Sequence, residues 1–203
     1  MNGIKLKISK PKDKLPAGSS KLFGNPDVWD GFEWPYIEEN GEKYDLTFMC
    51  QINCTDAVAF DKKELLPKTG ILYFFYDLDT MPEAADEKSA RVLWYNGDMS
   101  VLHEIMLTDE DGNSLAFSDQ KIDFESSDTD DKLSHLLLGE MTQSCDFIKG
   151  CLPLLRIGSF ETEDAEIRFK GNGWLCFYIE TEKLKAHDFS DVKAAQIYLG
   201  RRR

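Results

Sequence analysis

The fold is decided by one apolar run, Gly70-Ile-Leu-Tyr-Phe-Phe-Tyr76, which is followed by the polar residue Asp77. Its aromatic and β-branched residues are typical of a strand that is buried on both faces. Similar runs predict further strands over 46–52, 90–95, 101–107, 152–157, 165–169, 174–179 and 192–199. The pair Asn96-Gly97 is a hairpin signal between two of these strands.

Helical patterns are few and short. The best helix candidate covers 131–138 and ends at Gly139, a residue that often closes helices. Two weaker candidates are an amphipathic segment at 181–187 and a single turn at 61–67. We therefore expect an α+β fold, mainly antiparallel sheet with a few short helices.

Two parts of the chain share a pattern. Phe48-Met-Cys-Gln-Ile52 precedes the Gly70 run, and Leu154-Leu-Arg-Ile157 precedes Gly173-Trp-Leu-Cys-Phe-Tyr-Ile179 at a similar spacing. The repetition favours a duplicated strand pair, although any two buried strands resemble each other. We expect a single domain over 1–203, with two related halves at about 20–107 and 108–203.

The chain is strongly acidic, with a formal net charge of −13 over 203 residues. Such a charge repels nucleic-acid phosphate and anionic membrane surfaces, so we expect neither as a partner. It favours a basic protein partner, although solubility is the plainer explanation. The stretch 108–131 has nine acidic residues and one lysine, and its end, 125–131, is predicted to be a surface loop.

The composition also bears on the compartment. The five cysteines are odd in number, and the chain is not small, which argues against a disulfide framework. No apolar stretch approaches the roughly 18 to 20 residues that cross a bilayer. Residues 1–14 carry lysines without the apolar region of a secretory signal, so we expect a cytoplasmic protein.

Two patterns resemble metal sites, and one fails on spacing while the other lacks required residues. In one strand, Cys50 and Cys54 would stand about 13 Å apart, too far for one zinc ion. Asp109-x-Asp111-x-Asn113 resembles the start of an EF-hand loop, but the Gly and Glu that such a loop needs later are missing. A hairpin turn explains these residues better, and we expect no metal and no cofactor.

The motifs of nucleophilic catalysis and of phosphate binding are missing from the sequence. It has no Gly-x-Ser-x-Gly elbow and no glycine-rich loop that opens a helix. His103 and His135 fall in predicted regular elements, and His187 falls at a helix end, where a structural role is the commoner explanation. We therefore name no catalytic residue.

A segment rich in aromatic residues, glycine and proline covers 20–35. Because glycine and proline prevent a regular element there, we expect an ordered loop that packs its rings on the core. Trp29 and Trp34 in this loop, with the polar Gln51 and Arg156 of apolar strands, are the candidate ligand-binding residues. The alternative, which we favour, is a solid core in which these polar groups have structural partners.

Three places in the chain carry a family resemblance. They are Phe23-Gly24-x-Pro26 with Gly31-Phe-Glu-Trp-Pro35, Leu46-Thr-Phe-x-Cys-Gln51-Ile-Asn53 with Leu66-Pro-x-x-Gly70-Ile-Leu-x-Phe-Phe75, and Leu154-Leu-x-Ile157 through Gly173-x-Leu-x-Phe177 to Leu184-Lys-Ala-x-Asp188-Phe-Ser190. On these residues, which span about 20–199, the chain resembles the YwqG-like proteins, a bacterial family of unknown function. The resemblance implies a mixed fold with substantial antiparallel sheet, and it supplies no activity, cofactor or catalytic residue.

Two functions therefore remain open. The favoured one is a non-enzymatic protein-binding module for a basic partner, of which an immunity-like protein is one form. The other is an enzyme or a small-ligand binder that uses a groove under the loop of Trp29 and Trp34. A pocket beside these tryptophans that gathers convergent polar side chains would favour the second function.

Overall fold

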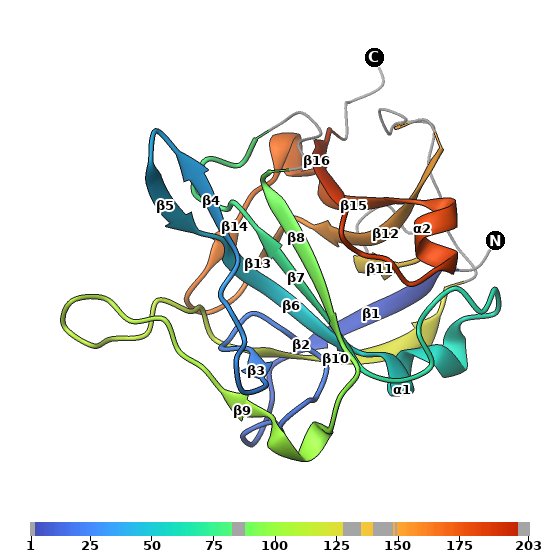
Figure 1. Cartoon of the computed structure of the whole chain (residues 1–203), viewed down its shortest axis with the longest axis horizontal. Helices are drawn as coiled ribbons and strands as arrows, with labels where there is room; N and C mark the ends of the chain where they lie inside the picture. Colours follow the sequence, from blue (N-terminus) through green and yellow to red (C-terminus); the bar gives the residue numbers. More distant parts are fainter. Residues whose placement is uncertain (1–2, 83–87, 128–134, 140–147, 149, 199–203) are drawn as a thin grey trace.

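The computed structural model describes residues 3–82, 88–127, 135–139, 148 and 150–198. Strands make up 43% of the structure and helices 10%, so the α+β class expected from the sequence is wrong and the chain is an antiparallel β protein (Figure 1). The candidate over 181–187 forms a helix at Thr181–Lys185, and a second helix lies at Cys54–Ala57. Both are about one turn long, too short to make a layer of their own.

One antiparallel sheet of ten strands organises the molecule. Its strands, in order across the sheet, are β16 (Lys193–Ile197), β15 (Trp174–Glu180), β12 (Cys151–Gly158), β11 (His135–Leu137), β1 (Ile4–Ser9), β10 (Gln120–Ser126), β2 (Lys21–Leu22), β6 (Thr47–Asn53), β7 (Ile71–Tyr76) and β8 (Ala90–Tyr95). The strands predicted over 46–52, 90–95, 152–157 and 174–179 are confirmed as β6, β8, β12 and β15, and the Gly70 run forms β7.

Smaller elements decorate this sheet. Three two-stranded ribbons pair β3 (Asp27–Val28) with β9 (His103–Glu104), β4 (Tyr36–Glu39) with β5 (Glu42–Asp45), and β13 (Phe160–Glu161) with β14 (Glu166–Ile167). The helices are α1 (Cys54–Ala57) and α2 (Thr181–Lys185), with 3-10 turns η1 (Val58–Phe60), η2 (Met99–Val101) and η3 (Lys170–Asn172). The turn predicted over 61–67 is not helical, because the Asp61 carboxylate accepts bonds from the backbone N–H groups of Leu65 and Leu66.

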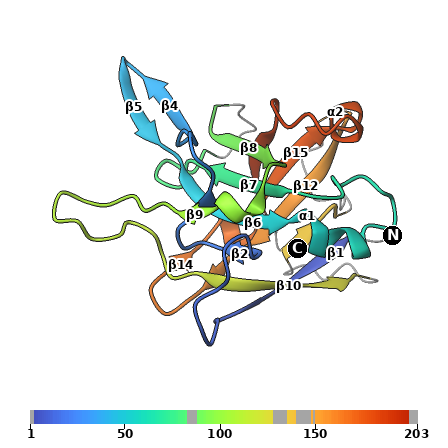
Figure 2. The ribbon, with the colours of Figure 1, turned by 60° about the horizontal axis from the view of Figure 1, so that its bottom comes forward.

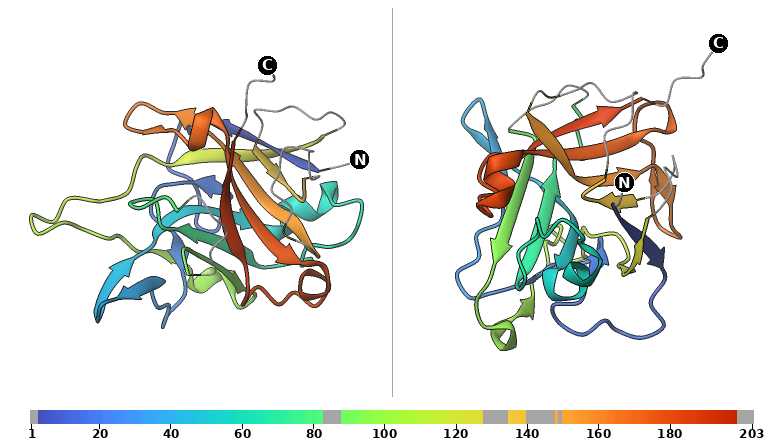
Figure 3. Two further views of the ribbon diagram at one scale, coloured as in Figure 1. Left: turned by 90° about the horizontal axis from the view of Figure 1, so that it is seen from above. Right: turned by 90° about the vertical axis from the view of Figure 1, so that its right-hand side faces the viewer.

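The sheet curls until its two edge strands, β8 and β16, contact each other (Figure 3). The main core fills the interior of this nearly closed sheet. Phe74 of β7 meets Phe177 of β15 edge-on across it, with ring centroids 5.3 Å apart. Because side chains alternate along β7, Tyr73 and Phe75 point the other way, onto a second cluster outside the sheet.

Two strands at the centre of the sheet, β1 and β10, correct the sequence-based expectation. We expected a loop over 125–131, but β10 continues to Ser126 and pairs with β1 in the register Ile4↔Ser126 to Ser9↔Lys121. The prediction also missed β1 entirely. In both strands, buried apolar residues alternate with lysine or aspartate, the pattern of strands with one wet face.

The helix predicted over 131–138 is wrong in its described part, because His135–Leu137 forms β11. The strand lies between β1 and β12, and Leu137 is fully buried there, so pairing on both sides prevails over helical propensity. Residues 131–134 lie outside the described residues. The hairpin predicted at Asn96-Gly97 is also wrong, since β9 pairs with β3 and not with β8.

Counted inward from one edge, the sheet runs β8, β7, β6, and counted inward from the other edge it runs β16, β15, β12. By position in the sheet, β6 therefore corresponds to β12 and β7 to β15. The pairing of β6 with β7 has a register irregularity between Phe48 and Cys50, and the pairing of β12 with β15 has one between Pro153 and Leu155. The skipped residues, Met49 and Leu154, each accept a backbone hydrogen bond of 2.8 Å from the neighbouring part of the sheet. Common descent of two halves stays a prediction.

No helix among the described residues combines the length and apolar character needed to cross a membrane.

Candidate functional site

In the aromatic loop, residues 23–35, the rings of Trp29, Phe32 and Trp34 pack on the outer face of β6, β7 and β8. Trp29 stacks on Tyr95, with ring centroids 4.5 Å apart and planes 7° apart. Trp34 packs edge-on against Phe75 at 5.6 Å, and its Nε1 donates to the Leu46 carbonyl at 2.8 Å. The loop therefore packs its rings on the sheet, as the sequence predicts.

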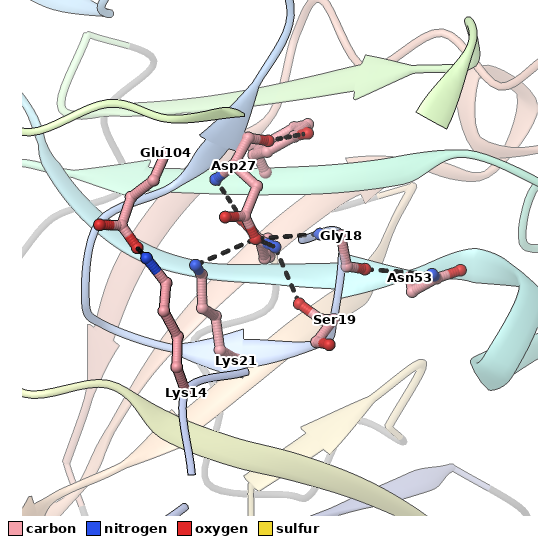
Figure 4. Close-up of polar contacts among 9 residues, drawn as sticks. Lys14, Gly18, Ser19, Lys21, Asp27, Asn53 and Glu104 are labelled. Carbon is pink, nitrogen blue, oxygen red and sulfur yellow. Dashed lines mark hydrogen bonds and ion pairs between the residues drawn. The ribbon is translucent and has the colours of Figure 1, made fainter. Parts of the chain in front are cut away.

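A buried polar network holds the start of this loop in place (Figure 4). The Asp27 Oδ2 atom accepts hydrogen bonds from Gly18 N at 3.0 Å and from Gln51 Nε2 at 2.7 Å. The same oxygen lies 3.0 Å from Lys21 Nζ, in an ion pair whose side chains are 7% and 4% exposed. Tyr73 donates its hydroxyl to the Asp27 carbonyl at 2.6 Å, so four segments of the chain meet at one residue.

Gln51 belongs to this network. It is fully buried, its Oε1 accepts from Asp27 N at 2.9 Å, and its Nε2 also donates to the Ser19 carbonyl at 2.8 Å. Burial, and next the Asp27 carboxylate, raise the pKa of the neighbouring Tyr73 phenol. The side-chain amide of Gln51 thus ties the start of the aromatic loop to β6. The ligand-binding role considered for Gln51 stays a prediction.

A groove of about 700 Å³ opens beside the aromatic loop. We call it the hairpin groove, because strand β4 of the β4–β5 hairpin forms one wall and β8 contributes Arg91 and Leu93 to the lining. Its lining residues include Trp29, Phe32, Glu33, Trp34, Tyr36, Ile37, Glu38, Lys88, Arg91 and Leu93. Of the four candidate residues, Trp29 and Trp34 therefore share one groove, and Gln51 lies beneath the loop.

The wall of the hairpin groove is acidic and aromatic. Glu33, Tyr36 and Glu38 of this wall line the groove. The whole segment 33–45 carries five carboxylates and one lysine, a net charge of −4. Tyr36 and Tyr44 are 38% and 48% exposed, and the Lys43 ammonium lies 4.0 Å from the centroid of the Tyr36 ring. This lysine shows how a cation is held here, over an aromatic face and among carboxylates. The hairpin stands away from the sheet in Figure 2.

Arg156 lies elsewhere in the sheet, on β12. Its guanidinium carbon is 4.5 Å from the centroid of the Trp174 ring, and its side chain is buried. Four strands, β11, β1, β10 and β2, separate it from the strand of Gln51. The structure therefore does not bring Gln51 and Arg156 into one site; they occupy corresponding places in β6 and β12.

No histidine lines the hairpin groove. His103 is exposed in β9, and His187 packs against Trp94 at 5.5 Å. His135 Nδ1 accepts a hydrogen bond from Gly158 N at 3.2 Å, and burial, followed by the charge of Arg156, lowers its pKa to about 4. The three imidazole rings therefore do not share a site with one another.

The other rejected motifs take structural positions as well. Asp109 accepts bonds from the backbone N–H groups of Asp111 and Asn113, which confirms a turn there. Cys50 and Cys54 are buried free thiols. Among the described residues no group of three or more metal-ligating side chains gathers.

Sequence reasoning missed the hairpin that completes the groove. The signal was present in Asn40-Gly41, because both residues have positive φ, at 54° and 84°, and this dipeptide is the commonest two-residue hairpin turn. Arg91 and Leu93 were also missed, since nothing in a predicted strand tells which face meets a loop elsewhere in the chain.

A comparison with protein families supplies the context for this geometry. The family model described as "Domain of unknown function (DUF1963)" matches residues 20–144. The chain belongs to this DUF1963 family. The match includes the whole aromatic loop, the β4–β5 hairpin and β8, so the hairpin groove lies within the DUF1963 domain. No curated protein matches the chain.

Proposed function

We propose that this DUF1963 protein is a protein-binding module that engages a basic partner through the hairpin groove. The observation that carries the proposal is the pairing of exposed rings with an acidic hairpin along one open groove. Aromatic side chains are enriched at the energetic centres of protein interfaces, and carboxylates nearby select the charge of the partner.

The rings of the groove are anchored, which suits binding. Trp29 and Trp34 are held from below by Tyr95 and Phe75, so a partner meets surfaces that are already ordered. Preorganised side chains lose less conformational entropy on binding. Arginine or lysine side chains of the partner would stack on these rings, as Lys43 does on Tyr36.

Charge supports a basic partner over an acidic one. The net charge of −13 raises the association rate of a cationic protein at low salt. Two of the five carboxylates of residues 33–45, those of Glu33 and Glu38, line the groove itself. Glu39 and Glu42 extend the acidic hairpin beyond the lining. The lining also contains Lys88 and Arg91, which balance the charges of Glu33 and Glu38 there. A partner segment that carries lysines together with a few carboxylates therefore fits best.

Site-specific photo-cross-linking tests the proposal. A benzophenone amino acid placed at Tyr36 should capture a basic protein in cells, while the same probe at Tyr198, which is 53% exposed, should not. The affinity of the captured protein is then measured with the purified chain. We expect it to fall about tenfold or more in the variant E38K/E39K and to fall as salt rises.

A matched variant controls for net charge. D56K/E64K changes the total charge by the same amount on exposed residues that do not line the groove, and should keep the affinity within about threefold. Capture of an acidic protein, equal capture from both probe positions, or equal losses in the two variants would each refute the proposal.

The proposal also covers the placement of the chain within its family and its cellular compartment. We place the chain among the YwqG-like proteins of the DUF1963 family, on the motifs around Phe23, Gln51 and Gly173. We also propose that it acts in the cytoplasm. The free thiols of Cys50, Cys54, Cys151 and Cys176 suit a reducing compartment.

A further inference from the structure

A second pocket, of about 480 Å³, opens on the other side of Trp34. It is separate from the hairpin groove, and Trp34 is the residue that lines both. We call it the Asp45–Asp79 pocket. Its lining is Phe23, Gly24, Asn25, Trp34, Asp45, Leu46, Thr47, Phe48, Leu78, Asp79, Leu107, Thr108, Leu115, Ala116 and Phe117. Its volume lies in the range of small-molecule sites, about 300 to 1,000 Å³.

The floor of the pocket is apolar and firmly built. Phe23, Leu46 and Phe48 are at most 4% exposed, so their visible atoms are the tips of core side chains. Phe117 packs edge-on against Phe23 at 5.1 Å between ring centroids. Gly24 N donates to the Phe117 carbonyl at 3.0 Å, which fixes the outer wall to the loop.

The rim of the pocket is negative. Asp45 and Asp79 are exposed, and their carboxylates form no ion pair or hydrogen bond with any residue in the described parts of the chain. No lysine, arginine or histidine is among the lining residues. Two carboxylates without a counter-charge, above an apolar floor, attract a cation whose body is apolar.

We propose that the Asp45–Asp79 pocket binds a small organic cation that joins an aromatic or aliphatic body to a primary ammonium group. The body covers Phe23, Phe48 and Phe117, and the ammonium group lies between Asp45 and Asp79. The face of Trp34 offers the cation a further contact. The proposal does not rest on the partner protein proposed for the hairpin groove, with which this pocket shares only Trp34 among the lining residues.

Two probes that share a phenethyl group and carry opposite charges test the site. Phenethylamine is a cation at pH 7, and 3-phenylpropionate is an anion. Isothermal titration calorimetry should give one site for phenethylamine with a dissociation constant of about 1 mM or lower, a value within the ligand efficiency of so small a molecule. The affinity for 3-phenylpropionate should be at least about tenfold weaker.

Isosteric variants assign the charge. D45N/D79N removes both charges while preserving the shape of the side chains, and should weaken phenethylamine at least about tenfold without lowering stability. E38Q, which neutralises a carboxylate of the hairpin groove, should change the affinity less than about twofold. A116W should block the pocket and abolish binding.

Each contrary outcome overturns the inference. These outcomes are equal affinity for the two probes, full affinity in D45N/D79N, a loss in E38Q as large as in D45N/D79N, or no binding of phenethylamine. The cross-linking from Tyr36 uses none of these variants, so failure of this pocket leaves the proposed protein partner standing, and failure there leaves this pocket standing.

Discussion

Lys21 of β2 and Asp27 of β3 form an ion pair of 3.0 Å with side chains that are 4% and 7% exposed. The same Asp27 oxygen accepts bonds from Gly18 and Gln51, so the pair fastens the start of the aromatic loop to the sheet. Removing one partner of such a pair leaves the other charge buried without compensation.

We therefore expect K21M to lower the free energy of unfolding by about 3 kcal/mol. Urea denaturation followed by circular dichroism measures the change. The control is K7M, which breaks the pair with Glu125, whose two side chains are 63% and 49% exposed. That variant should cost less than about 1 kcal/mol. Equal effects of the two substitutions would contradict the structural role of Lys21.

His135 should make stability depend on pH. Burial, and then Arg156, lower its pKa to about 4 in the folded chain, below the unfolded value of about 6.5. The unfolded state therefore binds more protons between these values, and stability is lost as pH falls from 6.5 toward 4. We expect a contribution on the order of 2 kcal/mol, which H135Q should remove from the pH profile of urea unfolding. An unchanged profile in H135Q would refute this assignment.

Two corresponding glycines should both resist substitution. A Cβ at Gly70 would collide with the Tyr95 carbonyl, and one at Gly173 with the Ile197 carbonyl. G70A and G173A should each cost about 3 kcal/mol or more, measured by thermal and urea unfolding. Gly112 has φ +81° but no atom within 4 Å of a Cβ, so G112A should cost only about 1 to 2 kcal/mol. A small effect at either sheet glycine would contradict the close approach of these strands.

Cys50 and Cys54 should be unreactive in the folded chain. Burial raises the pKa of the Cys54 thiol to about 12 and also raises that of Cys50, so neither forms thiolate near pH 8. Iodoacetamide labelling, located by mass spectrometry, should spare both residues in buffer and modify both in urea. Labelling of Cys50 in the native protein would show that β6 opens readily.

The sequence predicted the strands with continuous apolar runs and missed those with alternation. β7 has six consecutive buried residues, and a short apolar run of this kind is typical of a strand that is buried on both faces. In β1, Ile4 and Leu6 alternate with Lys5 and Lys7, and this short alternation was not recognised as a strand. β11 has only three residues, and such short apolar runs fit helix and strand alike, so pairing with β1 and β12 decides its conformation.

The candidate site was predictable only where its residues are close in sequence. Trp29 and Trp34 belong to one loop, and both line the hairpin groove. Gln51 and Arg156 were chosen as polar residues in apolar strands, and the partners that explain Gln51 lie 24 and 32 residues away. Long-range pairing of this kind depends on the sheet register, which single-strand patterns do not contain.

The central position of β1 bears on how the protein is made. Ile4 pairs with Ser126 on one side and with Leu137 on the other, so β1 leaves the ribosome long before either partner strand. At about 5 to 20 residues per second, it waits roughly ten seconds with both edges unpaired. A nascent chain arrested before Ser126 would therefore expose β1 to chaperones or to other chains, and the sheet can close only after β10 and β11 have emerged.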